Sequence, residues 1–183
     1  MVGEAAQERI GAWQRLVEPT SAIRSPVERA RAGLLVRLCL LLGSMGVVFD
    51  LILLQVFPGF ETRFPFVLVA ASLVLASGIG ARGVHWRAWG ALGITSTLVC
   101  ALLIGWVEPT DQVWPILIVT CTIFATAFLS PTMSIGITVV GFLGSLVVVL
   151  VAPGYESYAS IQSPLLIQIL CNPLIIIVAV QAD

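Results

Sequence analysis

The chain has 183 residues, of which 58% are hydrophobic and 10% are charged, with a mean hydropathy of +1.05 and a net charge of −1. A soluble domain of this length cannot hide so much apolar surface from water, whereas a lipid bilayer accommodates it. All nine basic residues are Arg, and most of them lie at the amino end or in one loop. This distribution is typical of a topology signal and argues against a nucleic-acid partner.

The first 33 residues carry charges throughout and lack the apolar core of a secretory signal. We expect residues 1–33 to form a cytoplasmic segment with a weak amphipathic helix over 2–17. A second helix is predicted to begin with Ser25 as its N-cap, Pro26 in its first turn and Glu28 as its third helical residue. This helix should continue without a break into the first apolar stretch.

Six apolar stretches follow, each close to the length of about 17 to 25 residues that a membrane-spanning helix needs. The predicted spans are 34–57, 64–80, 88–106, 114–130, 132–152 and 164–181. The fold class is therefore an all-α, polytopic membrane protein, in which six transmembrane helices form three hairpins over residues 34–183. A backbone that faces lipid must form all of its hydrogen bonds internally, and a helix does so.

Prolines recur at the predicted hairpins. Pro65, Pro115 and Pro164 open the second, fourth and sixth spans. Proline suits the first turn of a helix because its missing N–H would be unpaired there. The regular spacing is explained either by a threefold repeat of one hairpin or by the general preference for proline in such turns. Both explanations leave the three-hairpin layout unchanged.

The orientation of the spans follows from the Arg residues. Arg82, His85 and Arg87 occupy the loop between the second and third spans, and further Arg residues flank the first span on its amino side. The opposite loops are mainly acidic and hold Glu61, Glu108, Asp111 and Glu156 beside Arg63. Because positive loops stay in the cytoplasm, both termini are predicted to be cytoplasmic, in a multi-pass protein of the inner membrane.

Four tryptophans lie near predicted span ends, where aromatic rings commonly form belts at the membrane interface. They are Trp86 and Trp89 at the start of the third span, Trp106 at its end, and Trp114 at the start of the fourth. We expect these side chains to lie in the interface, with an aromatic ligand box as the alternative.

Asp50 is the only acidic residue well inside a span, and a charge at such depth is costly enough to mark a candidate functional group. Gln168 and Asn172 reach a comparable depth in the sixth span, so a ligand- or proton-binding layer of Asp50, Gln168 and Asn172 is predicted. The hydroxyl residues at similar depth are Ser96, Thr97, Thr120 and Thr122. Alternatively, Asp50 is neutral or bonded to a neighbour and only holds helices together.

Pro173 lies inside the sixth span, where proline removes a backbone hydrogen bond and bends the helix. The bend is either a hinge that passes a signal toward the carboxyl end or a static kink, which membrane helices tolerate.

The remaining residues offer little chemistry. The cysteines all fall inside predicted spans, which argues against a disulfide framework, and no Cys/His cluster suggests a zinc site. Small residues such as Gly43, Gly46, Gly141 and Ser145 have interface spacing and are expected to pack helices within the chain. With no nucleophile or phosphate-binding motif, we expect no catalytic residues, no cofactor and no metal.

The segment 25–37, SPVERARAGLLVR, leads straight into the first span. Together with the short loops, the basic turn at 82–87, the turn at 129–131 and a last span heading inward, it resembles the amino-terminal membrane modules of bacterial signalling proteins, such as the MASE-type sensors. Those modules precede histidine kinase, GAF, PAS or cyclase domains. The resemblance covers residues 25–183 and implies a non-enzymatic sensory or anchoring module. Its expected partners are the lipid bilayer, a second copy in a homodimer, and a cytoplasmic output domain beyond residue 183.

The alternative function is a small transporter, or the membrane subunit of one, with Asp50 as its coupling residue. Transporters commonly contain repeats and broken helices near the membrane midplane, which the prolines permit.

Overall fold

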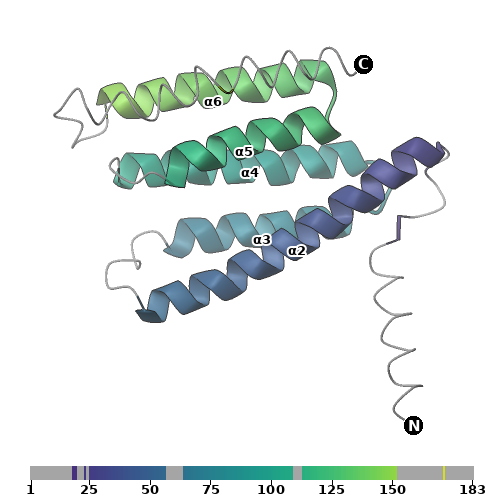
Figure 1. Ribbon diagram of the computed structural model, residues 1–183, viewed down its shortest axis with the longest axis horizontal. Helices are drawn as coiled ribbons and strands as arrows, with labels where there is room; N and C mark the ends of the chain where they lie inside the picture. The colour runs from purple at the N-terminus through teal and green to yellow at the C-terminus, as the bar shows by residue number, and fades with distance from the viewer. Residues whose placement is uncertain are drawn as a thin grey trace, which may run out of the picture.

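The computed structural model of the protein describes residues 18–19, 23, 25–56, 64–108, 113–151 and 171. Within them the chain forms α2 (Pro26–Val56), α3 (Phe64–Gly80), α4 (Trp86–Val107), α5 (Val113–Phe128) and α6 (Pro131–Val151). Figure 1 shows these helices side by side, with α2 running obliquely across the others. The predicted helical fold class is confirmed for this part of the chain.

The start of α2 follows the local sequence signal. The backbone N–H of Glu28 donates to Ser25 Oγ at 3.4 Å, and the N–H of Arg29 donates to the Ser25 carbonyl at 3.0 Å. The predicted N-cap is therefore confirmed. From Pro26 the helix continues for 31 residues, a length of about 46 Å at about 1.5 Å per residue. The charged first turns and the apolar stretch form one continuous helix, as predicted.

The other helices fall close to the predicted spans. α3 coincides with 64–80, and α4, α5 and α6 begin within two residues of the predicted starts. Pro65 and Pro115 lie in the first turns of α3 and α5, as expected. The predicted sixth span, 164–181, lies outside the described residues except for Cys171, and so does the predicted amphipathic helix over 2–17.

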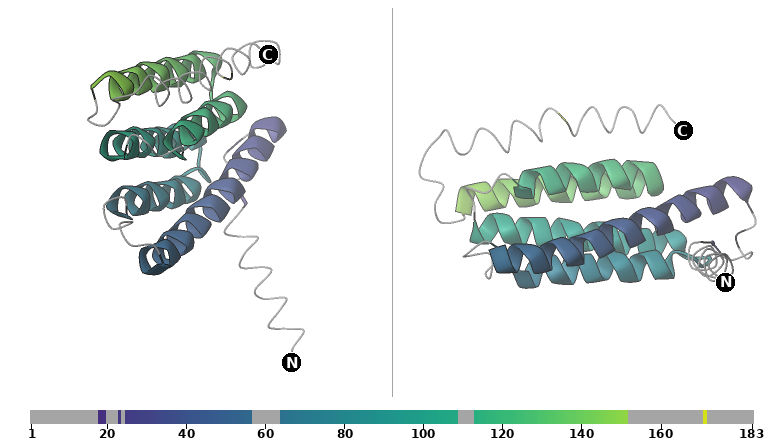
Figure 2. Two further views of the ribbon diagram at one scale, coloured as in Figure 1. Left: turned by 60° about the vertical axis from the view of Figure 1, so that its left-hand side comes forward. Right: turned by 60° about the horizontal axis from the view of Figure 1, so that its bottom comes forward.

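Successive helices pack as antiparallel neighbours, and α4 is the central one. It packs extensively on α3 and α5 and also contacts α2 and α6, while α2 packs chiefly on α3 (Figure 2). Ser134 on α6 donates its hydroxyl to the Ala125 carbonyl on α5 at 2.8 Å, which fixes the short turn between these two helices.

Small residues allow this close packing. A Cβ atom on Gly43 would lie 2.6 Å from Leu75 Cγ on α3, and one on Gly78 would lie 2.9 Å from Cys39 Cβ on α2. A Cβ on Gly141 would lie 3.0 Å from Ile118 Cγ2 on α5. The prediction that Gly43 and Gly141 pack helices within the chain is confirmed, and Gly78 has the same role.

The exterior of the bundle is apolar, unlike that of a soluble protein, and a few polar side chains are buried among the apolar core residues. Large apolar side chains such as Met45 (61% exposed), Phe49 (61%) and Leu150 (71%) face outward. The buried polar side chains of the described residues are Asp50, Ser77, Thr122, Ser134, Thr138 and Ser145. A monomeric soluble protein rarely exposes so continuous an apolar surface.

Three of the helices, α2, α4 and α6, are long and apolar enough to cross a membrane by length and composition. The apolar helices α3 and α5 are shorter, with 17 and 16 residues. Together with the apolar exterior, these helices give the described part of the chain the features of a membrane protein.

Candidate functional site

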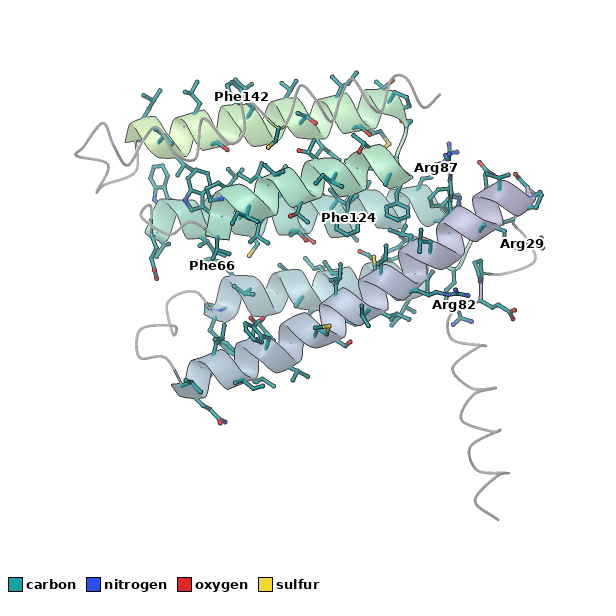
Figure 3. The ribbon with its side chains drawn as sticks, in the orientation of Figure 1. Arg29, Phe66, Arg82, Arg87, Phe124 and Phe142 are labelled. Atoms are coloured by element: carbon teal, nitrogen blue, oxygen red, sulfur yellow. The ribbon has the colours of Figure 1, made fainter. Side chains whose placement is uncertain are left out.

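A pocket of about 280 Å³ lies among α2, α3, α4 and α5 and is open along part of its surface. Its lining includes Cys39, Gly43 and Gly46 of α2, Ala70 and Ala71 of α3, Gly93 and Cys100 of α4, and Cys121 and Phe124 of α5. Phe124 points from α5 into the centre of the bundle (Figure 3). The space is several times the share of one water molecule, about 30 Å³ in the liquid, so it accommodates a small organic molecule.

Gly90 and Gly93 of α4 also line this space and are buried. A Cβ on Gly90 would lie 2.8 Å from Leu35 Cδ2, and one on Gly93 would lie 3.1 Å from Ser77 Cβ, so both glycines allow close approach of neighbouring helices. We call this space the inner cavity.

The inner cavity offers almost no free polar group. Thr97 and Thr120 line it, but their hydroxyls donate to the carbonyls of Gly93 at 2.9 Å and Ile116 at 2.8 Å on their own helices. The hydroxyl groups of these two residues of the predicted layer are therefore already bonded within their own helices. The lining therefore favours an uncharged, mainly apolar ligand.

Asp50 is the exception among the buried polar groups. Its side chain is 3% exposed, and Oδ2 has no hydrogen-bond partner among the described residues. The other buried polar side chains bond to backbone carbonyls: Ser77 to Leu73, Thr122 to Ile118, Ser134 to Ala125, Thr138 to Ser134 and Ser145 to Gly141. A buried acceptor left without a donor is costly, so it marks a functional candidate.

Asp50 lies beside one end of the inner cavity. It is one helical turn beyond Gly46, which lines the cavity, so it lies on the same face of α2 as Gly46. Cys100 of α4 and Cys121 of α5 also line the cavity. Sequence reasoning found Asp50 but missed these thiols. The sequence signal that could have identified Cys100 and Cys121 is that both lie at a distance from their helix ends similar to that of Asp50.

The structure does not test the other predicted site residues. Gln168, Asn172 and Pro173 lie outside the described residues, so their grouping with Asp50 stays a prediction. Cys39, Cys100 and Cys121 are buried and free, which agrees with the prediction that they take no part in a disulfide framework. No group of three or more His, Cys, Asp or Glu side chains that could hold a metal ion occurs in the described residues.

Basic side chains gather at the end of the bundle where α2 begins. Arg29, Arg82 and Arg87 lie there together (Figure 3). Arg87 Nη2 donates to Glu28 Oε1 at 2.9 Å, and its guanidinium lies 5.3 Å from the Trp86 ring centroid. The ion pair therefore links the first turn of α2 to the first turn of α4.

The four tryptophans of the predicted aromatic belt differ in burial. Trp89 and Trp106 are 38% and 42% exposed. Trp86 and Trp114, by contrast, are 3% and 0% exposed. Trp114 packs against Gly105 of α4, where an added Cβ would lie 2.8 Å from the indole. These two rings are core residues, because tertiary packing turns them inward at the same depth.

Comparison of the chain with protein-family models, curated proteins and solved structures found no match in any of the three.

Proposed function

We propose that the chain is the membrane-embedded sensory and anchoring module of a bacterial signal-transduction protein, which relays to a cytoplasmic output domain beyond residue 183. The observation that carries this proposal is α2, a single helix from Pro26 to Val56 that lines the inner cavity and continues into the charged end of the bundle. A continuous helix transmits a displacement along its length. The Glu28–Arg87 ion pair passes that displacement to α4.

In the proposed topology the chain crosses the bacterial inner membrane six times, and both termini lie in the cytoplasm. The gathering of Arg29, Arg82 and Arg87 at one end supports a cytoplasmic position for that end. Alkaline phosphatase fused after residue 84 should then be inactive, and phosphatase fused after residue 110 should be active. The reverse pattern would contradict this orientation.

The relay proceeds in this proposal through the span 164–181, with Pro173 as its hinge and with Gln168 and Asn172 beside Asp50. The module carries no reaction of its own, and its partners are lipid, a second copy of the chain and the output domain.

The test is to read the gene beyond codon 183 and to assay the encoded full-length protein in membranes. A heptad-patterned linker followed by a kinase or cyclase domain is expected. Asp50→Asn should keep the membrane level and the unfolding temperature but remove the response of the output activity. Ser44→Ala on the exposed side of α2 is the matched control. A stop codon after position 183 would contradict the proposal.

The second candidate is a transporter, and the unpartnered Oδ2 of Asp50 is the observation that favours it. A buried carboxyl that binds and releases a proton is a suitable coupling group. In vesicles that contain the purified chain and a trapped pH-sensitive dye, a transporter would show solute-dependent proton flux, and Asp50→Asn would abolish that flux. Equal flux in protein-free vesicles would exclude this candidate.

A further inference from the structure

A second hollow lies on the outer side of the α3–α4 pair. This outer groove has a volume of about 530 Å³. Val69 of α3 and Leu92, Val99 and Leu103 of α4 line it, and each is at least 40% exposed. The hydroxyl of Thr95 in the groove donates to the Ala91 carbonyl at 2.7 Å. In a bilayer this groove therefore presents an apolar surface to the lipid chains.

The inner cavity and the outer groove share two lining residues, Ala70 on α3 and Cys100 on α4. Both are buried, at 7% and 5% exposed, so they form the wall between the two spaces. One methyl group and one thiol are small for a helix–helix seam. At this point the lipid-facing groove and the inner cavity are therefore separated by the side chains of Ala70 and Cys100.

Asp50 carries the only buried side-chain acceptor of the described residues that lacks a donor: it is 3% exposed, and its Oδ2 has no partner there. It lies on α2 one helical turn beyond Gly46, which lines the inner cavity. A molecule that enters the inner cavity past Cys100 would contact mainly small apolar side chains. The Asp50 carboxyl would be the one acceptor without a donor. Such a lining selects an uncharged, lipophilic molecule that carries a single hydrogen-bond donor.

We infer that the inner cavity binds an uncharged lipophilic molecule with one hydrogen-bond donor, which enters sideways from the bilayer between α3 and α4 past Ala70 and Cys100. The donor is held by Asp50. If the chain has the sensory function proposed above, this molecule is its stimulus, and the inference gives the chemical class of that stimulus.

The entry route is tested with a diazirine-bearing octanol, which has an apolar body and one hydroxyl. The purified chain in phospholipid vesicles is irradiated with this probe, and its adducts are mapped by mass spectrometry. Adducts are expected at inner positions such as Leu117 and Phe124 as well as at outer positions such as Val99 and Leu103. Cys100→Phe should remove the inner adducts and keep the outer ones. Val147→Phe on α6, which adds similar bulk at an exposed position outside both spaces, should keep both.

The donor preference is tested in the wild-type chain by competition, so it does not depend on how Cys100→Phe folds. Octanol should displace the inner label at about tenfold lower concentration than octane, since only octanol can bond to the carboxyl. In Asp50→Leu the two competitors should become equivalent.

The inference is overturned if the inner positions of the wild-type chain are never labelled, or if octane competes as well as octanol. Equal inner labelling in a folded Cys100→Phe variant overturns the lateral route. Labelling is measured on this chain alone, so it tests the binding site independently of the sensory function. If a full-length protein binds the probe without any change in output activity, the sensory function is contradicted and the binding site is not.

Discussion

Glu28 Oε1 and Arg87 Nη2 lie 2.9 Å apart although 59 positions separate the two residues along the chain. The pair fixes the charged beginning of α2 to the beginning of α4. Both side chains are about half exposed, at 43% and 50%, so solvent screens their attraction.

The pair should consequently contribute little to stability, and its contribution should depend on salt. A double-mutant cycle with Glu28→Gln and Arg87→Gln is expected to give a coupling energy below about 1 kcal/mol, which falls as salt is raised. The measurement is the unfolding of each variant in detergent micelles at low and high salt. The exchanged pair, Glu28→Arg with Arg87→Glu, serves as the control and should restore the coupling. A large, salt-independent coupling would show that the pair is shielded from solvent.

Close packing of α2 on α3 depends on Gly43. A Cβ there would lie 2.6 Å from Leu75 Cγ and 3.0 Å from the Leu75 backbone nitrogen, which cannot move aside as a flexible side chain can. Gly43→Ala should therefore lower the free energy of unfolding by about 1–3 kcal/mol. Gly136→Ala on α6 is the matched control, because nothing among the described atoms lies within 4 Å of its Cβ position. It should be neutral or stabilising by up to about 1 kcal/mol. Equal effects of the two changes in the same unfolding assay would contradict the observed α2–α3 packing.

The two tryptophans on either side of the α4–α5 turn differ in environment. Trp114 is fully buried under Gly105, whereas Trp106 is 42% exposed. Helices in a bilayer are held by packing, so the void left by Trp114→Ala should cost about 3 kcal/mol. Trp106→Ala should cost less than about 1 kcal/mol. Thermal unfolding in micelles distinguishes the two, and a reversed order would contradict the assignment of Trp114 to the core.

Much of the described fold could be predicted because it depends on local signals. The Ser25 cap, the first turns that contain proline and the ends of α3 each depend on a few consecutive residues. The inner cavity could not be predicted, because it depends on which side chains of four helices face one another. The tryptophans illustrate the same limit. Trp86 and Trp89 stand one turn apart with similar sequence signals, yet one is buried and the other is exposed.

The candidate site was predictable in the same partial way. Asp50 was identifiable as a costly residue inside an apolar stretch, and the structure buries its side chain. Cys100 was not identifiable, because a thiol in an apolar helix looks like any small packing residue. One expectation was that a nearby hydroxyl would donate a hydrogen bond to the Asp50 carboxyl. Among the described residues none donates to Oδ2, and the hydroxyls of Thr97 and Thr120 donate instead to carbonyls of their own helices.

An unpartnered buried carboxyl oxygen should cost stability. Asp50→Leu is therefore expected to raise the free energy of unfolding by about 1–3 kcal/mol, because it removes a buried polar group that lacks a donor. Asp50→Asn, which keeps a polar side chain of the same shape, should stay close to wild type. Unfolding of both variants in micelles provides the comparison. A loss of stability in Asp50→Leu would instead support a role for Asp50 in holding the helices together.

Lipid contact of the outward-facing side chains is the claim on which the rest depends, and spin-label accessibility measures it most directly. Single nitroxide labels at Met45, Val99 and Val140, each at least 55% exposed in the middle of α2, α4 and α6, are compared with a label at Val84 in the turn before α4. In lipid vesicles the three helix labels should collide mainly with oxygen, which concentrates in the bilayer, and the Val84 label mainly with a water-soluble nickel complex. Nickel-dominated collisions at all three helix positions would contradict a membrane-embedded bundle.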